Sequence, residues 1–126
     1  MSHISKIELE INDLESLKTA CQLMGLEFCE NQKTFEWYGG RQECEHAIKI
    51  PGATYEIGVI RKAEGKGYQL IWDNYHRGGL EQKLGGNAGK LKQAYAMERI
   101  RKEARVKGYR VLEQRLNQGI RLVLTM

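Results

Sequence analysis

The stretches TYEIGVIR (54–61) and GYQLIWD (67–73) decide the fold. Each is a short run rich in β-branched and aromatic residues, and a polar turn around Glu64-Gly65-Lys66 separates them. This pattern predicts a β-hairpin. Because side chains alternate along a strand, Tyr68 and Trp72 are expected on the same face.

The chain before this hairpin predicts one more strand and a helix. Residues 4–11 alternate apolar and charged side chains, which is typical of a half-buried strand. Asn12 and Glu15 approximate a capping box, and an amphipathic helix follows that ends at Gly25.

Two further strands are expected between this helix and the hairpin. They are residues 34–38 and 46–50, arranged around a turn at Gly39-Gly40. The segment is therefore expected to form a meander.

The C-terminal half predicts a loop, a long helix and a second hairpin. The glycine-rich residues 77–89 are expected to form a long loop, with at most one helical turn. Residues 88–107 are rich in Ala, Lys, Arg and Glu and end at Gly108, which predicts a helix. Residues 109–115 and 119–125 are expected to pair across a turn.

These elements together predict an α+β fold in one domain covering residues 1–126. We expect two helices packed on a mostly antiparallel sheet, in a ferredoxin-like arrangement. Hydrophobic residues make up 41% and charged residues 29%, which is ordinary globular composition. The N-terminal stretch has no long apolar run, so a secretory signal, a membrane span and a membrane partner are not predicted.

The long helix has apolar residues on more than one face. One face carries Met97, Ile100 and Ala104, and another carries Leu91, Ala94 and Tyr95. A second contact is therefore expected, either to a loop of the same chain or to another subunit.

The charge of the chain is asymmetric. Residues 1–60 hold five Lys/Arg against ten Asp/Glu, whereas residues 61–126 hold fifteen against six. The asymmetry favours an anionic partner for the basic half or head-to-tail self-association, and a solvated charged surface is the plain alternative.

The string GGNAGK (85–90) resembles a phosphate loop but departs from the pattern at Leu84 and Leu91. Nucleotide hydrolysis is therefore not predicted. Anion binding at the helix N-terminus remains, with a flexible loop as the alternative. The candidate binding residues here are Lys83, Gly85, Gly86, Asn87, Gly89, Lys90 and Lys92, followed by Arg101 and Arg105 on the helix.

A polar cluster follows the first hairpin. Asp73, Tyr75, His76 and Arg77 place an acid, a phenol, an imidazole and a guanidinium within five positions. Such clusters at strand ends often line sites, so Tyr75, His76 and Arg77 join the candidate binding residues. A small enzyme centred on this cluster is a further alternative, but no catalytic residue can be assigned.

Cysteines and histidines give no metal-binding pattern. Cys21, Cys29 and Cys44 contain no CxxC pair, and the three histidines are scattered. We expect no metal and no cofactor, and a reducing cytoplasm suits the free thiols.

Several segments resemble the plastid and cyanobacterial family called hypothetical chloroplast reading frame thirty-five, which has bacterial and phage relatives. They are MSHISKI, DLESLKTACQLMGL, YEIGVIRKAEGKGYQLIWD, and QAYAMERIRKEARVKGY followed by IRLVL. The chain departs from the family in ending with Thr125-Met126 instead of a basic residue and tryptophan. The resemblance implies a small cytosolic or stromal protein without an assigned reaction.

The leading hypothesis is a non-catalytic protein that binds an anionic, nucleotide-like ligand. The ligand would be RNA or a nucleotide second messenger, which a phage relative could sequester. The alternative is a structural or regulatory homo-oligomer, built on the oppositely charged halves and the two-faced helix.

Overall fold

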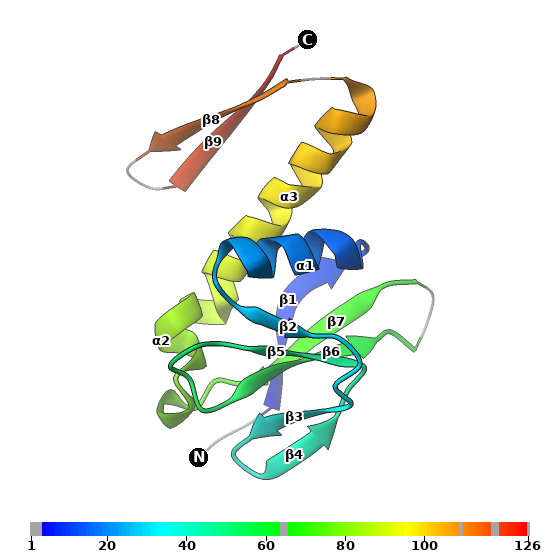
Figure 1. Ribbon diagram of the computed structural model, residues 1–126. Coiled ribbons are helices and arrows are strands. Elements are labelled where there is room, and N and C mark those ends of the chain that lie inside the picture. Colours follow the sequence, from blue (N-terminus) through cyan, green and yellow to red (C-terminus); the bar gives the residue numbers. More distant parts are fainter. Residues whose placement is uncertain (1–3, 64–65, 109, 117–118, 126) are drawn as a thin grey trace.

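The computed structural model describes residues 4–63, 66–108, 110–116 and 119–125 (Figure 1). Its centre is a five-stranded sheet of order β1-β7-β6-β5-β2, in which every neighbouring pair is antiparallel. The strands are β1 (Ile4–Ile11), β2 (Glu27–Cys29), β5 (His46–Lys49), β6 (Glu56–Arg61) and β7 (Tyr68–Asp73). The expected α+β class, with helices on a mostly antiparallel sheet, is confirmed.

The hairpin of β6 and β7 lies in the middle of the sheet, as predicted, and both of its faces are buried. Val59 pairs with Leu70, and both belong to the core beneath the helices. Trp72 and Tyr68 contribute to that core from the same face of β7. Ile71 points to the opposite face and belongs to a second, smaller core.

Three α-helices lie on one face of the sheet: α1 (Leu14–Leu23), α2 (Leu80–Leu84) and α3 (Gly89–Lys107). Helix α1 connects β1 to β2, which occupy opposite edges of the sheet. The predicted cap at Asn12 is wrong by one residue. The carboxylate of Asp13 accepts the hydrogen bond from the Ser16 backbone N–H (3.3 Å), because an N-cap side chain reaches the amide three residues on.

The glycine-rich segment is helical, which corrects the expected long loop. It forms a 3₁₀ turn η1 (His76–Gly78), then α2, then a second 3₁₀ turn η2 (Gly86–Ala88) that leads into α3. The physical reason is a set of four fully buried apolar residues at helical spacing. They are Leu80, Leu84, Ala88 and Leu91. Glycines between them break the segment into short pieces without exposing this apolar face.

A small hairpin covers the other face of the sheet. It consists of β3 (Thr34–Trp37) and β4 (Gly40–Glu43), which pair with each other. The meander prediction is therefore wrong in its pairing, since β5 pairs with β6 and β2. The polar sequence of β4 and the three-residue length of β2 gave no strand pattern. Phe35 of β3 is fully buried against Ala47 and Ile71.

The second contact of α3 is made by the same chain. Leu91 and Tyr95 are buried, and the Tyr95 hydroxyl accepts hydrogen bonds from the backbone N–H groups of Asn12 (3.0 Å) and Asp13 (3.2 Å). The face expected to carry Met97, Ile100 and Ala104 is only partly covered. Ala104 is buried, but 38% of Ile100 is exposed.

A two-stranded sheet follows α3 and lies at the end of the helix distant from the main sheet (Figure 1). Its strands β8 (Arg110–Leu116) and β9 (Gly119–Thr125) confirm the expected terminal hairpin, whose turn at 117–118 lies outside the described residues. Helix α3 ends at Gly108 in the left-handed conformation (φ 78°), as predicted. Among the described residues, no helix has the length and apolar character that crossing a membrane requires.

Candidate ligand-binding surface

Three lysines lie around the start of α3. Lys83 belongs to α2, and Lys90 and Lys92 belong to the first turn of α3. Lys83 and Lys90 are exposed and Lys92 is half-buried. Within the described part of the chain, none of these three ammonium groups has an acidic partner. They are therefore available to an external anion.

The backbone before α3 has an unusual shape that is fixed by contacts. Asn87 and Ala88 both adopt positive φ angles, 53° and 57°. Ala88 is fully buried, and the Asn87 side chain accepts a hydrogen bond from the Glu8 backbone N–H (3.4 Å), which ties the loop to β1. Among the described residues, no side chain caps the N-terminus of α3. Gly85, Gly86 and Gly89 complete this loop.

Arg101 and Arg105 lie far from these lysines. They follow Lys90 by 11 and 15 residues, which places them about 16 and 22 Å further along the helix axis. Arg101 also donates to the buried carboxylate of Glu98 (2.6 Å). The structure therefore does not bring the two arginines to the predicted site.

Neighbouring basic side chains on α3 serve the fold instead. Arg99 (3.0 Å) and Lys102 (2.5 Å) both bind the carboxylate of Asp13 at the start of α1. Burial raises the pKa of Asp13, but hydrogen bonds from Lys102 and Ser16 more than offset this and bring it to about 2. This cluster joins α1 to α3 and leaves the three unpaired lysines as a separate group.

The predicted cluster from Asp73 to Arg77 divides into a buried acid and an exposed loop. Asp73 is fully buried, and its two carboxylate oxygens accept hydrogen bonds from the backbone N–H groups of Tyr38 (3.2 Å) and Tyr75 (3.0 Å). Tyr75 is half-buried, whereas His76 and Arg77 are exposed. Asp73 therefore holds the backbone of residues 38 and 75 in place, and the side chains of Tyr75, His76 and Arg77 reach the surface.

Sequence reasoning missed Tyr38, which belongs to this surface. Its ring lies 5.8 Å from the ring of Tyr75 in an edge-on arrangement, and Tyr75 lies 4.7 Å from the ring of His76 in the same way. Tyr38 is 65% exposed. The only sequence signal was its place beside the Gly39-Gly40 turn, which gives no indication of contact with residue 75.

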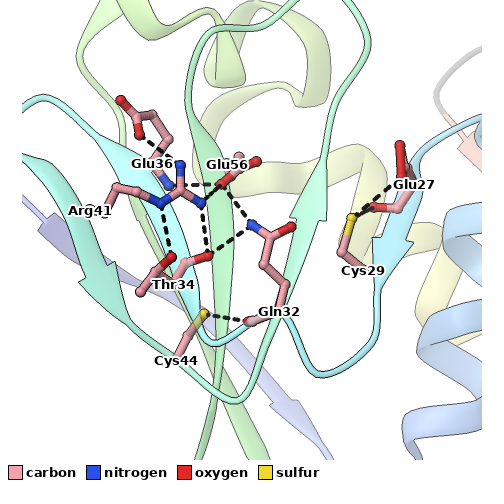
Figure 2. Close-up of polar contacts among 8 residues, drawn as sticks. All are labelled: Glu27, Cys29, Gln32, Thr34, Glu36, Arg41, Cys44 and Glu56. Carbon is pink, nitrogen blue, oxygen red and sulfur yellow. Dashed lines mark hydrogen bonds and ion pairs between the residues drawn. The ribbon is translucent and has the colours of Figure 1, made fainter.

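A second cluster of polar side chains lies under the β3–β4 hairpin, and its members bind one another. Figure 2 shows the Arg41 guanidinium binding Thr34 Oγ1 (2.8 Å), Glu36 (3.0 Å) and Glu56 (3.4 Å). The nearly buried Glu56 also accepts from the Gln32 side chain (3.1 Å) and the Glu36 backbone N–H (2.9 Å). Because Glu56 Oε1 on β6 accepts these bonds from the hairpin side, the group holds the hairpin on the sheet.

The three cysteines are not activated. Burial raises the pKa of Cys21 to about 12 and that of Cys44 to about 11, and it also raises the pKa of Cys29. These thiols are protonated at neutral pH and are therefore poor nucleophiles. Among the residues that the structure describes, no three His, Cys, Asp or Glu side chains lie close enough to hold a metal ion.

The fold defines an α+β protein with helices on one face of an antiparallel sheet and a hairpin on the other. The chain belongs to the family described as Protein of unknown function (DUF1257), whose model matches residues 20–123. The match runs from the last turn of α1 through most of β9 and includes the segment between β7 and α3. Searches of curated proteins and of solved structures found no match.

Proposed function

We propose that this protein is a cytoplasmic, non-catalytic binding protein for an anionic, nucleotide-like ligand. The observation that carries the proposal is the set of unpaired lysines, Lys83, Lys90 and Lys92, around the N-terminus of α3. Arg99, Arg101 and Lys102 of α3 have acidic partners, whereas these three lysines have none among the described residues. Because the sequence resembles a plastid and cyanobacterial family with phage relatives, we propose that those relatives bind the same class of ligand.

The helix itself supports this assignment. An α-helix N-terminus carries a partial positive charge and backbone N–H groups that favour anions. Helix α3 has no side-chain cap at this end, and its first turn carries no acidic residue. The field of the helix and the charges of Lys90 and Lys92 therefore act in the same direction.

The polar groups elsewhere favour binding over catalysis. The Asp73 carboxylate is buried with both oxygens accepting backbone hydrogen bonds, and Glu56 is bound by Arg41 and Gln32. A general acid or base needs to reach a substrate proton, which the buried Asp73 carboxylate cannot do in this arrangement. This argues against the alternative of a small enzyme centred on Asp73, Tyr75, His76 and Arg77.

A homo-oligomer remains the second candidate function, favoured by a different observation. The face of Leu91 and Tyr95 is covered within the chain, so it gives no reason for an oligomer. However, Ile100 is 38% exposed and Val106 81% exposed on the C-terminal half of α3. Sedimentation of the wild type and of Val106→Glu tests this candidate, which requires an oligomer that the substitution dissociates.

Titration at two salt concentrations tests the proposed function. Fluorescence anisotropy would follow labelled nucleotides, cyclic dinucleotides and short RNA binding to the wild type and to a variant with Lys90→Glu and Lys92→Glu. We expect binding that weakens as salt rises, with the slope of log K against log salt reduced by about 2 in the variant.

A matched control carries Lys33→Glu and Lys66→Glu, two exposed lysines outside the surface. Both double variants change the net charge equally, so a general charge effect would appear in both. Equal affinity of the wild type and the Lys90/Lys92 variant would show that the site is wrong. The proposal fails altogether where no anionic probe binds the wild type at low salt.

A further inference from the structure

Exposed Tyr38, half-buried Tyr75 and exposed His76 lie together in a series of ring contacts. Tyr38 comes from the turn after β3, and Tyr75 and His76 come from the segment after β7. Their rings contact in series at 5.8 and 4.7 Å. We call these three side chains the aromatic platform. It leaves 65% of Tyr38 exposed, so at least one ring is open to an external partner.

A single buried carboxylate holds the platform in place. Asp73 accepts the backbone N–H of Tyr38 through one oxygen and that of Tyr75 through the other. Beneath it, Tyr55 packs so closely on Gly78 that a Cβ there would lie 2.0 Å from the Tyr55 ring. The two loops are therefore fixed before any ligand arrives, and preorganisation of this kind reduces the cost of binding.

The platform is joined to the lysine surface by a short, bonded segment. The Gln82 side chain of α2 donates to the His76 carbonyl oxygen (2.8 Å), and Lys83 is the next residue. Exposed Arg77 lies next to His76 in sequence. Aromatic rings and cations thus follow one another from Tyr75 to Lys92, which is the composition of sites that bind single-stranded nucleic acid.

We propose that the aromatic platform stacks on an unpaired base of a single-stranded nucleic acid whose phosphates bind Lys83, Lys90 and Lys92. This inference rests on the proposed function and names the class of ligand. A free nucleotide is normally enclosed by a concave pocket, whereas Tyr38 stands 65% exposed. An open ring together with several separate cations suits a polymer that supplies several phosphates and bases in a row.

The test compares three probes of about eight units each: oligo(U), oligo(dT) and an abasic oligonucleotide of the same length. The proteins are the wild type, Tyr38→Ala, Tyr38→Phe and the Lys90/Lys92 double variant. Tyr38→Ala keeps the backbone N–H that binds Asp73, so the loop is retained, and circular dichroism would check this. A probe carrying 2-aminopurine gives a second readout, because stacking quenches its fluorescence.

We expect Tyr38→Ala to weaken oligo(U) binding about tenfold, with Tyr38→Phe near wild type and the abasic probe unaffected. The wild type should quench 2-aminopurine more than Tyr38→Ala does. Equal affinity for RNA and DNA indicates that stacking and phosphate contacts suffice, and tighter RNA binding adds a 2′-hydroxyl contact. Either result is consistent with the proposal.

Two outcomes separate this inference from the proposed function. If Tyr38→Ala binds oligo(U) as tightly as the wild type while the Lys90/Lys92 variant loses binding, the platform is wrong and the anion site stands. The same conclusion follows if free nucleotides bind and oligonucleotides do not. If the lysine variant keeps full affinity for every probe, the proposed site itself is wrong.

Discussion

The ring of Phe35 lies directly against the backbone of Gly58, at the centre of the contact between the β3–β4 hairpin and the sheet. A Cβ at residue 58 would lie 2.5 Å from Phe35 Cδ1 and 2.7 Å from Cε1. Phe35 is fully buried. The hairpin can approach the sheet this closely only because β6 has no side chain at this position.

Gly58→Ala should therefore destabilise the protein by about 1–3 kcal/mol, the usual cost of overpacking a core. Urea unfolding would measure it. Gly89→Ala is the matched control, because its φ of −54° is helical and nothing lies within 4 Å of its added Cβ. The control should raise stability by about 0.5 kcal/mol. Destabilisation of similar size at both positions would contradict the proposed contact.

Asp13→Asn should cost about 1 kcal/mol near neutral pH, because it removes the charge that Arg99 and Lys102 bind while keeping an N-cap acceptor. The native pKa of Asp13, about 2, lies below its ordinary value of 3.8. The stability from this carboxylate is thus complete above about pH 3.8 and is lost as the pH falls towards 2.

The difference between wild type and Asp13→Asn should accordingly narrow when urea unfolding is repeated below about pH 3.8. Glu103→Gln is the control, since Glu103 forms an exposed pair with Lys107 and exposed pairs contribute little. A difference at Asp13 that stays constant in acid would mean that its charge is not responsible.

His46 should make the protein less stable below neutral pH. Its Nδ1 accepts the Asn31 backbone N–H (2.9 Å), and its ring contacts the rings of Phe28 and Tyr68. Burial lowers the pKa of His46 below 6.5, although nearby Glu30 opposes the shift. The neutral form is therefore favoured by folding, so its contribution is complete above about pH 6.5 and is lost as the pH falls below it.

His46→Gln keeps an acceptor for Asn31 but cannot titrate. The stability difference between wild type and this variant should shrink between about pH 7.5 and 5.5. His76→Gln, at an exposed position, is the control. The stability difference between wild type and His76→Gln should change less over this pH range. The prediction is wrong if the two variants show the same pH dependence.

The parts of the fold that the sequence predicted are those in which local pattern and burial agree. In β6 and β7, Val59 and Ile71 are both strand-forming and both buried, so propensity and tertiary contact favour the same structure. The prediction for residues 77–89 was wrong because the glycines of this segment suggested a loop. The spacing of Leu80, Leu84 and Ala88 was a usable helical signal that composition obscured.

The candidate surface was predictable only where it is continuous in sequence. Lys83, Lys90 and Lys92 were found because they surround one loop. The contact of Tyr38 with Tyr75 depends on where the β3–β4 hairpin sits on the sheet, and the bonds from Asp73 that hold it there are tertiary. Arg101 was included because periodicity places it on the same side of the helix as Lys90, but periodicity takes no account of distance along the axis.

The position of β1 at the sheet edge has a consequence for the order in which the chain is made. Among the described strands, β1 pairs with β7 alone, with Ile4 opposite Asp73 and Ile7 opposite Leu70. During translation, β1 leaves the ribosome several seconds, on the order of 3–12 s, before its partner has been synthesised. During this interval β1, with its alternating apolar face, has no partner strand to pair with. The sheet can be completed only after β7 exists, so β1 is made well before it can be incorporated.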